Sequence, residues 1–181
     1  MNTLQIIEEY YTRDSLSYRT LVAHGEVVAE KALAVAARVD HLGPDLPFIR
    51  EAALLHDIGI FLTDAPSIGC HGDAAYICHG FLGRDLMERA GFPRHALVCE
   101  SHVGVGITVA EIEDKRLPLP RREIKPRSLE ERIICYADKF FSKSGEFSHK
   151  EKPVEEVRTH LARLGGGKVA RFEEMHALFG A

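Results

Sequence analysis

Six side chains that can ligate a metal ion stand on or beside apolar stretches of this sequence. They are His24, His56, Asp57, His79, His102 and Asp138. The apolar run ALLHDIGIFL, residues 53–62, holds two of them in its middle. An unpaired carboxylate in such a setting loses much of its hydration energy. A divalent cation would remove this cost, and neutral imidazole together with carboxylate oxygen suits Fe, Mn, Zn, Ni or Co.

Each of these residues, taken singly, also has a purely structural explanation. A lone histidine on an apolar face is usually hydrogen-bonded to a backbone carbonyl, and Asp138 could be an ion-pair partner of a lysine. The structural explanation would have to hold for every member of the set within one small core. We therefore predict that the imidazoles and carboxylates converge on a metal site.

Helical periodicity predicts the elements that carry this set. The expected helices lie at about residues 15–39, 45–60, 75–86, 93–102, 128–141, 153–164 and 169–179. Ser128 and Glu131 have the spacing of a capping box. Three prolines exclude a regular helix over 114–127, and GGG at 165–167 separates the last two helices. No strand alternation of useful length occurs.

The fold class is therefore all-α, a bundle of about six to eight helices. At 181 residues the chain is most simply one domain, 1–181, with a core at about 15–145 and a C-terminal helical extension at 153–179.

Composition excludes several classes of function. Lysine and arginine total 23 against 27 acidic residues, which gives a net charge of −4 and argues against bulk nucleic-acid binding. The N-terminus lacks the pattern of a signal peptide, and no apolar run approaches the roughly 18 residues of a membrane span. The four cysteines are scattered without a C-x-x-C motif. We expect a cytoplasmic protein with reduced thiols.

The ordered set resembles the HD-domain superfamily of metal-dependent phosphohydrolases over roughly residues 20–143. The stretches HDIG, HGFLG, HVGVGIT and LEERIICYAD carry the resemblance, which is to small single-domain members with the extended ligand set of a two-metal site. It implies an all-helical core. It also implies one metal held by His24, His56, Asp57 and Asp138, and a second held by Asp57, His79 and His102, with Asp57 as the bridge.

The implied activity is phosphohydrolysis of a nucleotide or another small phosphate ester, as a monoesterase or a diesterase. His56 and Asp57 would be the catalytic pair of a binuclear centre, and a hydroxide between the two cations would attack phosphorus. Such a site needs no serine or cysteine nucleophile.

The substrate contacts are expected to be cationic. Many two-metal members of the superfamily have lysine where this chain has Ile60, so Lys143 or Arg84 is the candidate phosphate ligand instead. The segment 115–127 is rich in lysine and arginine and joins His102 to Asp138. It could form a flap that meets substrate phosphates through Arg121 and Arg122, or it could be a solvated connection.

Two other functions remain open from the residues alone. Some HD-fold proteins hold a di-iron centre with a similar ligand set and act as oxygenases, and others are non-catalytic modules that sense a nucleotide. The apolar stripes of the last two helices could close the core or form the face of a homodimer.

Overall fold

The computed structural model describes residues 2–143, 150–165 and 167–180. Within these residues the chain forms nine α-helices, so the expected all-α class is confirmed with more helices than the six to eight anticipated. They are α1 Thr3–Tyr10, α2 Leu16–Arg38, α3 Leu46–Leu55, α4 His79–Arg89, α5 Pro93–Ser101, α6 Val109–Asp114, α7 Leu129–Asp138, α8 Val154–Leu164 and α9 Lys168–Phe179. None of these helices is long and apolar enough to cross a membrane.

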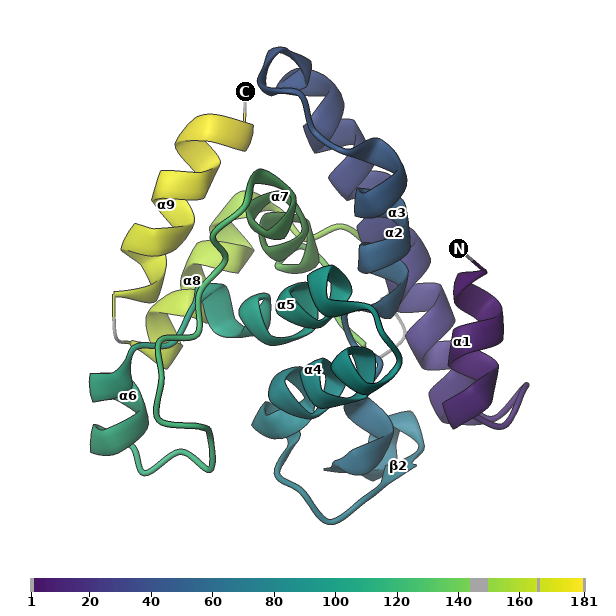
Figure 1. Cartoon of the computed structure of the whole chain (residues 1–181). Helices are drawn as coiled ribbons and strands as arrows, with labels where there is room; N and C mark the ends of the chain where they lie inside the picture. Colours follow the sequence, from purple (N-terminus) through teal and green to yellow (C-terminus); the bar gives the residue numbers. More distant parts are fainter. Residues whose placement is uncertain (1, 144–149, 166, 181) are drawn as a thin grey trace.

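Helices α5 and α7 lie at the centre of the molecule (Figure 1). Helices α2 and α3 pack together on one side of them, and α8 and α9 lie on the other. The main core joins α2, α3, α7 and α9 through fully buried side chains such as Val28, Ile49, Ile133 and Phe172. A second apolar cluster lies between α1, α3 and α4. Helices from the N-terminal and the C-terminal parts of the chain therefore pack around the central helices.

Local sequence signals set several helix starts. The Ser15 hydroxyl accepts a hydrogen bond from the Tyr18 N–H at the start of α2, and the Asp45 carboxylate does the same for the Phe48 N–H of α3. The predicted capping box of Ser128 and Glu131 opens α7. Each such cap satisfies a backbone donor that the first helical turn leaves without a partner.

The helix expected to run to residue 60 ends earlier, at Leu55. The chain then turns sharply, which places His56 and Asp57 beyond the helix end. Gly59 allows this turn to touch α4, since a Cβ at this position would overlap the His79 carbonyl oxygen and the Gly83 nitrogen. The close approach holds the turn that carries Asp57 against the start of α4.

Some short elements were not expected from the sequence. Helix α6 begins with a second capping box, formed by Thr108 and Glu111. Strands β1 Asp64–Ala65 and β2 Cys70–His71 pair antiparallel, with Asp64 opposite His71. Two-residue strands and a six-residue helix are too short to show a hydrophobic period.

Candidate metal centre

The structure brings all six expected ligands together, and most of them stand at helix ends. His24 lies within α2, whereas His56 and Asp57 follow directly after α3. His79 is the first residue of α4, His102 follows α5, and Asp138 is the last residue of α7. All six are buried, and the exposed fraction of both His56 and Asp57 is 0%. Five of the six candidate ligands therefore stand at the ends of four different helices.

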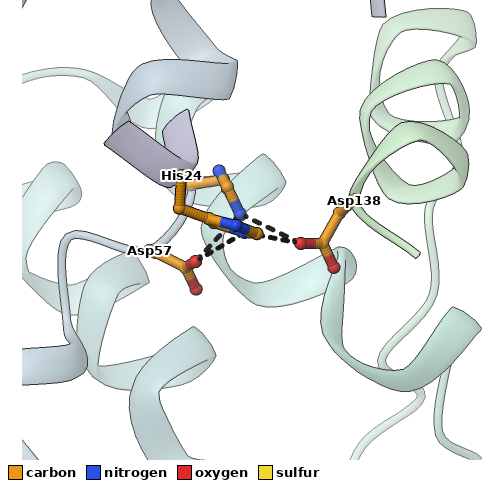
Figure 2. A group of neighbouring side chains, drawn as sticks. His24, Asp57 and Asp138 are labelled. Carbon is orange, nitrogen blue, oxygen red and sulfur yellow. Dashed lines mark hydrogen bonds and ion pairs between the residues drawn. The ribbon is translucent and has the colours of Figure 1, made fainter. Parts of the chain in front are cut away.

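The first group of ligand atoms surrounds one oxygen of each aspartate. The Nε2 atom of His24 lies 2.9 Å from Asp138 Oδ1 and 3.4 Å from Asp57 Oδ2. The Nε2 atom of His56 lies 3.0 Å from Asp57 Oδ2 and 3.5 Å from Asp138 Oδ1. Figure 2 shows His24 between the two carboxylates. These four residues could hold one metal ion.

The second group surrounds the other oxygen of Asp57. Asp57 Oδ1 lies 3.2 Å from His79 Nε2 and 3.3 Å from His102 Nε2. The two imidazole nitrogens are 3.1 Å apart. Asp57 thus presents one oxygen to each group, which is the arrangement of a bridging carboxylate.

Backbone carbonyls orient three of the four imidazoles. The Nδ1–H groups of His56 and His79 donate to the carbonyls of Ala53 and Tyr76, each at 2.6 Å. His102 Nδ1 lies 3.3 Å from the Val98 carbonyl. A proton on Nδ1 leaves a lone pair on Nε2, which is how a ligating histidine is normally fixed.

The resulting arrangement fits a cation. With Nδ1 protonated, His79 and His102 direct lone pairs at each other and at a carboxylate oxygen, and such a set is repulsive unless a positive charge lies among them. Nε2 of His56 and Asp57 Oδ1 are buried without a hydrogen-bond partner among the described residues. Asp57 Oδ2 is equally buried, and its neighbours are two imidazole nitrogens and the ammonium group of Lys143. A donor set of imidazole nitrogens and carboxylate oxygens suits divalent transition metals.

Electrostatics keeps most of these groups in their ligating forms. Burial lowers the pKa of His24 to about 4 and that of His79 to about 3. Burial opposes ionisation of Asp57, but His56 and Lys143 hold the pKa of its carboxyl well below the usual range. Burial also disfavours a charged His56, yet Asp57 and Asp138 raise its pKa to about 9. The two carboxylates thus attract positive charge strongly.

Two lysines stand beside the carboxylates. Lys143 Nζ lies 2.8 Å from Asp57 Oδ2, and Lys139 Nζ lies 2.7 Å from Asp138 Oδ2. Lys143 was a sequence candidate for the phosphate ligand, and its position is compatible with that role. Nothing in the sequence indicates that the ammonium group of Lys139 turns toward the candidate ligands.

A cavity of about 480 Å³ opens onto His79, His102, Asp138 and both lysines. Much of its wall is apolar: Ile77, Val103, Ile107, Leu117, Phe141, Leu161 and Leu164. A cavity of this size holds a small organic ligand. Helix α8, which lies beyond the span of the resemblance, supplies part of the wall, including His160. The apolar stripe of α8 does not by itself predict a place in the cavity wall, because such a stripe is equally typical of a helix packed against the core.

The structure places the three candidate arginines at ion pairs with neighbouring carboxylates. Arg84 binds Glu88 and Glu100, and Arg122 also binds Glu100. Arg121 pairs with Glu113 and is largely exposed. None of the three arginines lines the cavity, because the carboxylates of neighbouring segments hold them elsewhere. Of the 115–127 segment, only Lys115 and Leu117 reach the cavity wall.

Comparison with known proteins identifies one relative of similar length. The uncharacterised protein MJ0778 of Methanocaldococcus jannaschii is 32% identical over 155 residues, which cover 83% of this chain and 81% of that protein. The chain belongs to the family of this protein. No family model matches the chain, and no solved structure matches it.

Two further relatives are much longer than the matched region. The tRNA (cytidine(56)-2'-O)-methyltransferases of Thermoplasma volcanium and Picrophilus torridus are 28% and 29% identical. The matches cover 80% and 67% of this chain. The chain spans only 40% and 31% of these enzymes' own length.

These names correct one expectation from the sequence. The sequence predicts a hydrolase, and the names of these two relatives contradict that classification because both are called methyltransferases. The all-α part of that classification is confirmed.

Proposed function

We propose that this chain binds two divalent metal ions and uses them to cleave a phosphate ester with water. The observation that supports the proposal most is the position of the Asp57 carboxylate. One of its oxygens faces His24 and His56, and the other faces His79 and His102. We also propose that the chain is a member of the HD-domain superfamily and acts in the cytoplasm. The methyltransferase names describe proteins of which the chain spans less than half, so the proposal concerns this domain alone.

In this proposal one ion is held by His24, His56, Asp57 and Asp138. Asp57, His79 and His102 hold the other. When bound, such ions lower the pKa of water and neutralise charge on phosphoryl oxygens.

The chain's own residues supply the remaining functions. The carbonyls of Ala53 and Tyr76 keep the imidazoles of His56 and His79 in the ligating tautomer. The ammonium groups of Lys139 and Lys143 provide cationic hydrogen-bond donors for a phosphate group. The apolar wall of the cavity limits water around the ester and strengthens these polar contacts.

Metal content and activity test the proposal together. Protein purified without oxygen is analysed for bound metal and then assayed with phenyl phosphate and bis-(4-nitrophenyl) phosphate in the presence of Mn, Co, Fe or Ni. We expect about two metal equivalents per chain and turnover that disappears with chelator. Full activity after metal removal, confirmed by elemental analysis, would refute the proposal.

A di-iron oxygenase is the main alternative use of the same ligand set. Lys139 and Lys143 favour the phosphate proposal, because they place two cationic donors beside the ligands. Consumption of oxygen by iron-loaded protein, with no cleavage of either ester, would favour the oxygenase. Tight binding of a nucleotide without turnover under any of these conditions would favour a non-catalytic sensing module.

A further inference from the structure

A buried ion pair borders the same cavity on elements that supply no metal ligand. Glu111 lies on α6 and Lys168 begins α9. Their exposed fractions are 8% and 6%, and Lys168 Nζ lies 2.9 Å from Glu111 Oε1. Both side chains line the cavity. We call these two residues the Glu111–Lys168 pair.

The pair offers a ligand one hydrogen-bond acceptor, on Glu111, next to one hydrogen-bond donor, on Lys168. Glu111 Oε2 accepts hydrogen bonds from the Thr108 N–H and from Arg171, both at 2.8 Å. Glu111 Oε1, by contrast, is buried without a hydrogen-bond partner that meets the geometry of such a bond, and it lies 2.9 Å from Lys168 Nζ. The Lys168 ammonium donates to the Gly106 carbonyl and forms an ion pair with Glu111, and its three N–H donors leave at least one for another acceptor.

The charge of Glu111 is set by its neighbours. Burial alone would raise the pKa of Glu111, but the Thr108 N–H together with Lys168 and Arg171 lowers it to about 2. Glu111 is therefore an acceptor at neutral pH. The combination of one acceptor beside one cationic donor is complementary to a group that carries an N–H next to a C=O.

We infer that the Glu111–Lys168 pair binds the lactam edge of a heterocyclic ring in the organic part of the ligand. The ring N–H donates to Glu111 Oε1, and the adjacent ring carbonyl accepts from Lys168. Ile107 and Leu117 line the same cavity and offer apolar contact to the ring. The inference rests on the proposed function in one respect, namely that the phosphate group binds at the metal centre.

The position of the pair suits a ligand that also reaches the metal centre. Gly104 follows His102 by two residues, and a Cβ on Gly104 would lie 3.8 Å from Lys168 Nζ. A short turn therefore connects a metal ligand to the pair. The cavity of about 480 Å³ is larger than a phosphate group requires and has room for a ring.

A structural role for the pair is the main alternative, because Glu111 caps α6 and helps to join it to α9. Arg171 separates the two possibilities: it binds Glu111 and Gly106 like Lys168, but it does not line the cavity. Lys115 provides a second comparison, because it lines the cavity without an ion-pair partner among the described residues.

The test measures binding to metal-loaded protein by calorimetry. The probes are uridine and guanosine 5′-monophosphates and their N3-methyl and N1-methyl analogues, which lack the lactam N–H. For at least one nucleotide we expect wild-type protein to prefer the unmethylated form by roughly tenfold or more, since an unpaired buried polar group is costly. In Lys168→Met and Glu111→Gln the preference should fall to about twofold or less.

Lys115→Met and Arg171→Met should keep the wild-type preference. The inference is overturned if wild type binds both forms equally or binds none of the probes. It is also overturned if Arg171→Met abolishes the preference as fully as Lys168→Met does. Cleavage of phenyl phosphate is measured in parallel. This ester carries no lactam group, so loss of the lactam preference and loss of the proposed activity are separate results.

Discussion

At the scale of single residues, the site depends on where each lone pair points. Asp57 has no exposed surface, and its two oxygens serve different groups of imidazoles. His79 and His102 contact only one of these oxygens, Oδ1. Substitution of Asp57 and substitution of His79 or His102 should therefore have different effects on the amount of bound metal.

Asp57→Asn should lose both metals or bind them far more weakly, because each proposed site loses a carboxylate oxygen. His79→Ala should keep about one metal equivalent, because the His24, His56, Asp57 and Asp138 set stays complete. Elemental analysis of protein loaded under identical conditions measures both. His71→Ala serves as the control, since His71 is an exposed histidine of β2. The two-metal assignment is wrong if wild type and His79→Ala bind the same single equivalent with equal activity.

Lys143→Met should weaken contact with the phosphate group more than it slows turnover. The Lys143 ammonium lies beside Asp57, and a lost charge-assisted hydrogen bond of about 1.5–3 kcal/mol corresponds to a rise in KM of roughly tenfold or more. Steady-state kinetics with phenyl phosphate measures the effect. Lys125→Met removes an exposed lysine outside the cavity wall and should leave KM unchanged. An unchanged KM in Lys143→Met would remove this lysine from the substrate contacts.

At the scale of elements, ion pairs hold the 115–127 segment against the helices. Glu100 on α5 has an exposed fraction of 5%, and it binds Arg84 of α4 together with Arg122. The segment also pairs with the turn after α5 through the hydrogen bonds between Ile107 and Ile124. These contacts favour a fixed border of the site over a cationic flap.

Arg122→Ala should therefore reduce stability and leave the kinetics unchanged. Buried Glu100 would lose one of its two cationic partners, at a cost of about 1 kcal/mol, since Arg122 is itself half exposed. Denaturant unfolding measures the stability, and KM for a nucleotide measures substrate contact. Arg121→Ala is the matched comparison and should alter neither, because its pair with Glu113 is exposed. A large rise in KM for either variant would restore the flap.

At the scale of the whole molecule, the buried imidazoles link folding to pH. In the folded chain His24 and His79 stay neutral down to pKa values of about 4 and about 3, against 6.5 for the ordinary side chain. The unfolded chain therefore binds more protons as the pH falls below 6.5. His56 acts oppositely, because its folded-state pKa of about 9 means that the folded chain holds a proton which the unfolded chain has lost.

For protein kept in chelator, the free energy of unfolding should be greatest near pH 6.5. It should decrease as the pH falls toward 4 and also as the pH rises toward 9. Added divalent metal should remove the alkaline decrease, because a cation takes the place of the proton on His56 and stabilises the folded state. Urea unfolding at several pH values measures this. A chelated protein whose stability rises steadily from pH 6.5 to 9 would contradict the assignment.

The sequence by itself determined the candidate ligand set and most of the helices. Periodic apolar residues and the Ser128–Glu131 capping box act within a few residues, so they can be read locally, and α2, α5 and α7 lie within a few residues of the expected ranges. Ionisable side chains within apolar stretches likewise singled out the six candidate ligands that the structure brings together.

Only the tertiary structure decided how these parts meet. Helix α3 stops at Leu55 because the following turn packs against α4 at Gly59, a contact between segments that no local period encodes. Arginine partners were likewise unpredictable, since a guanidinium group binds whichever carboxylate the fold brings near. The cavity wall from α8 and the Glu111–Lys168 pair also join segments far apart in the chain. Their positions follow from long-range packing, which a single sequence does not display.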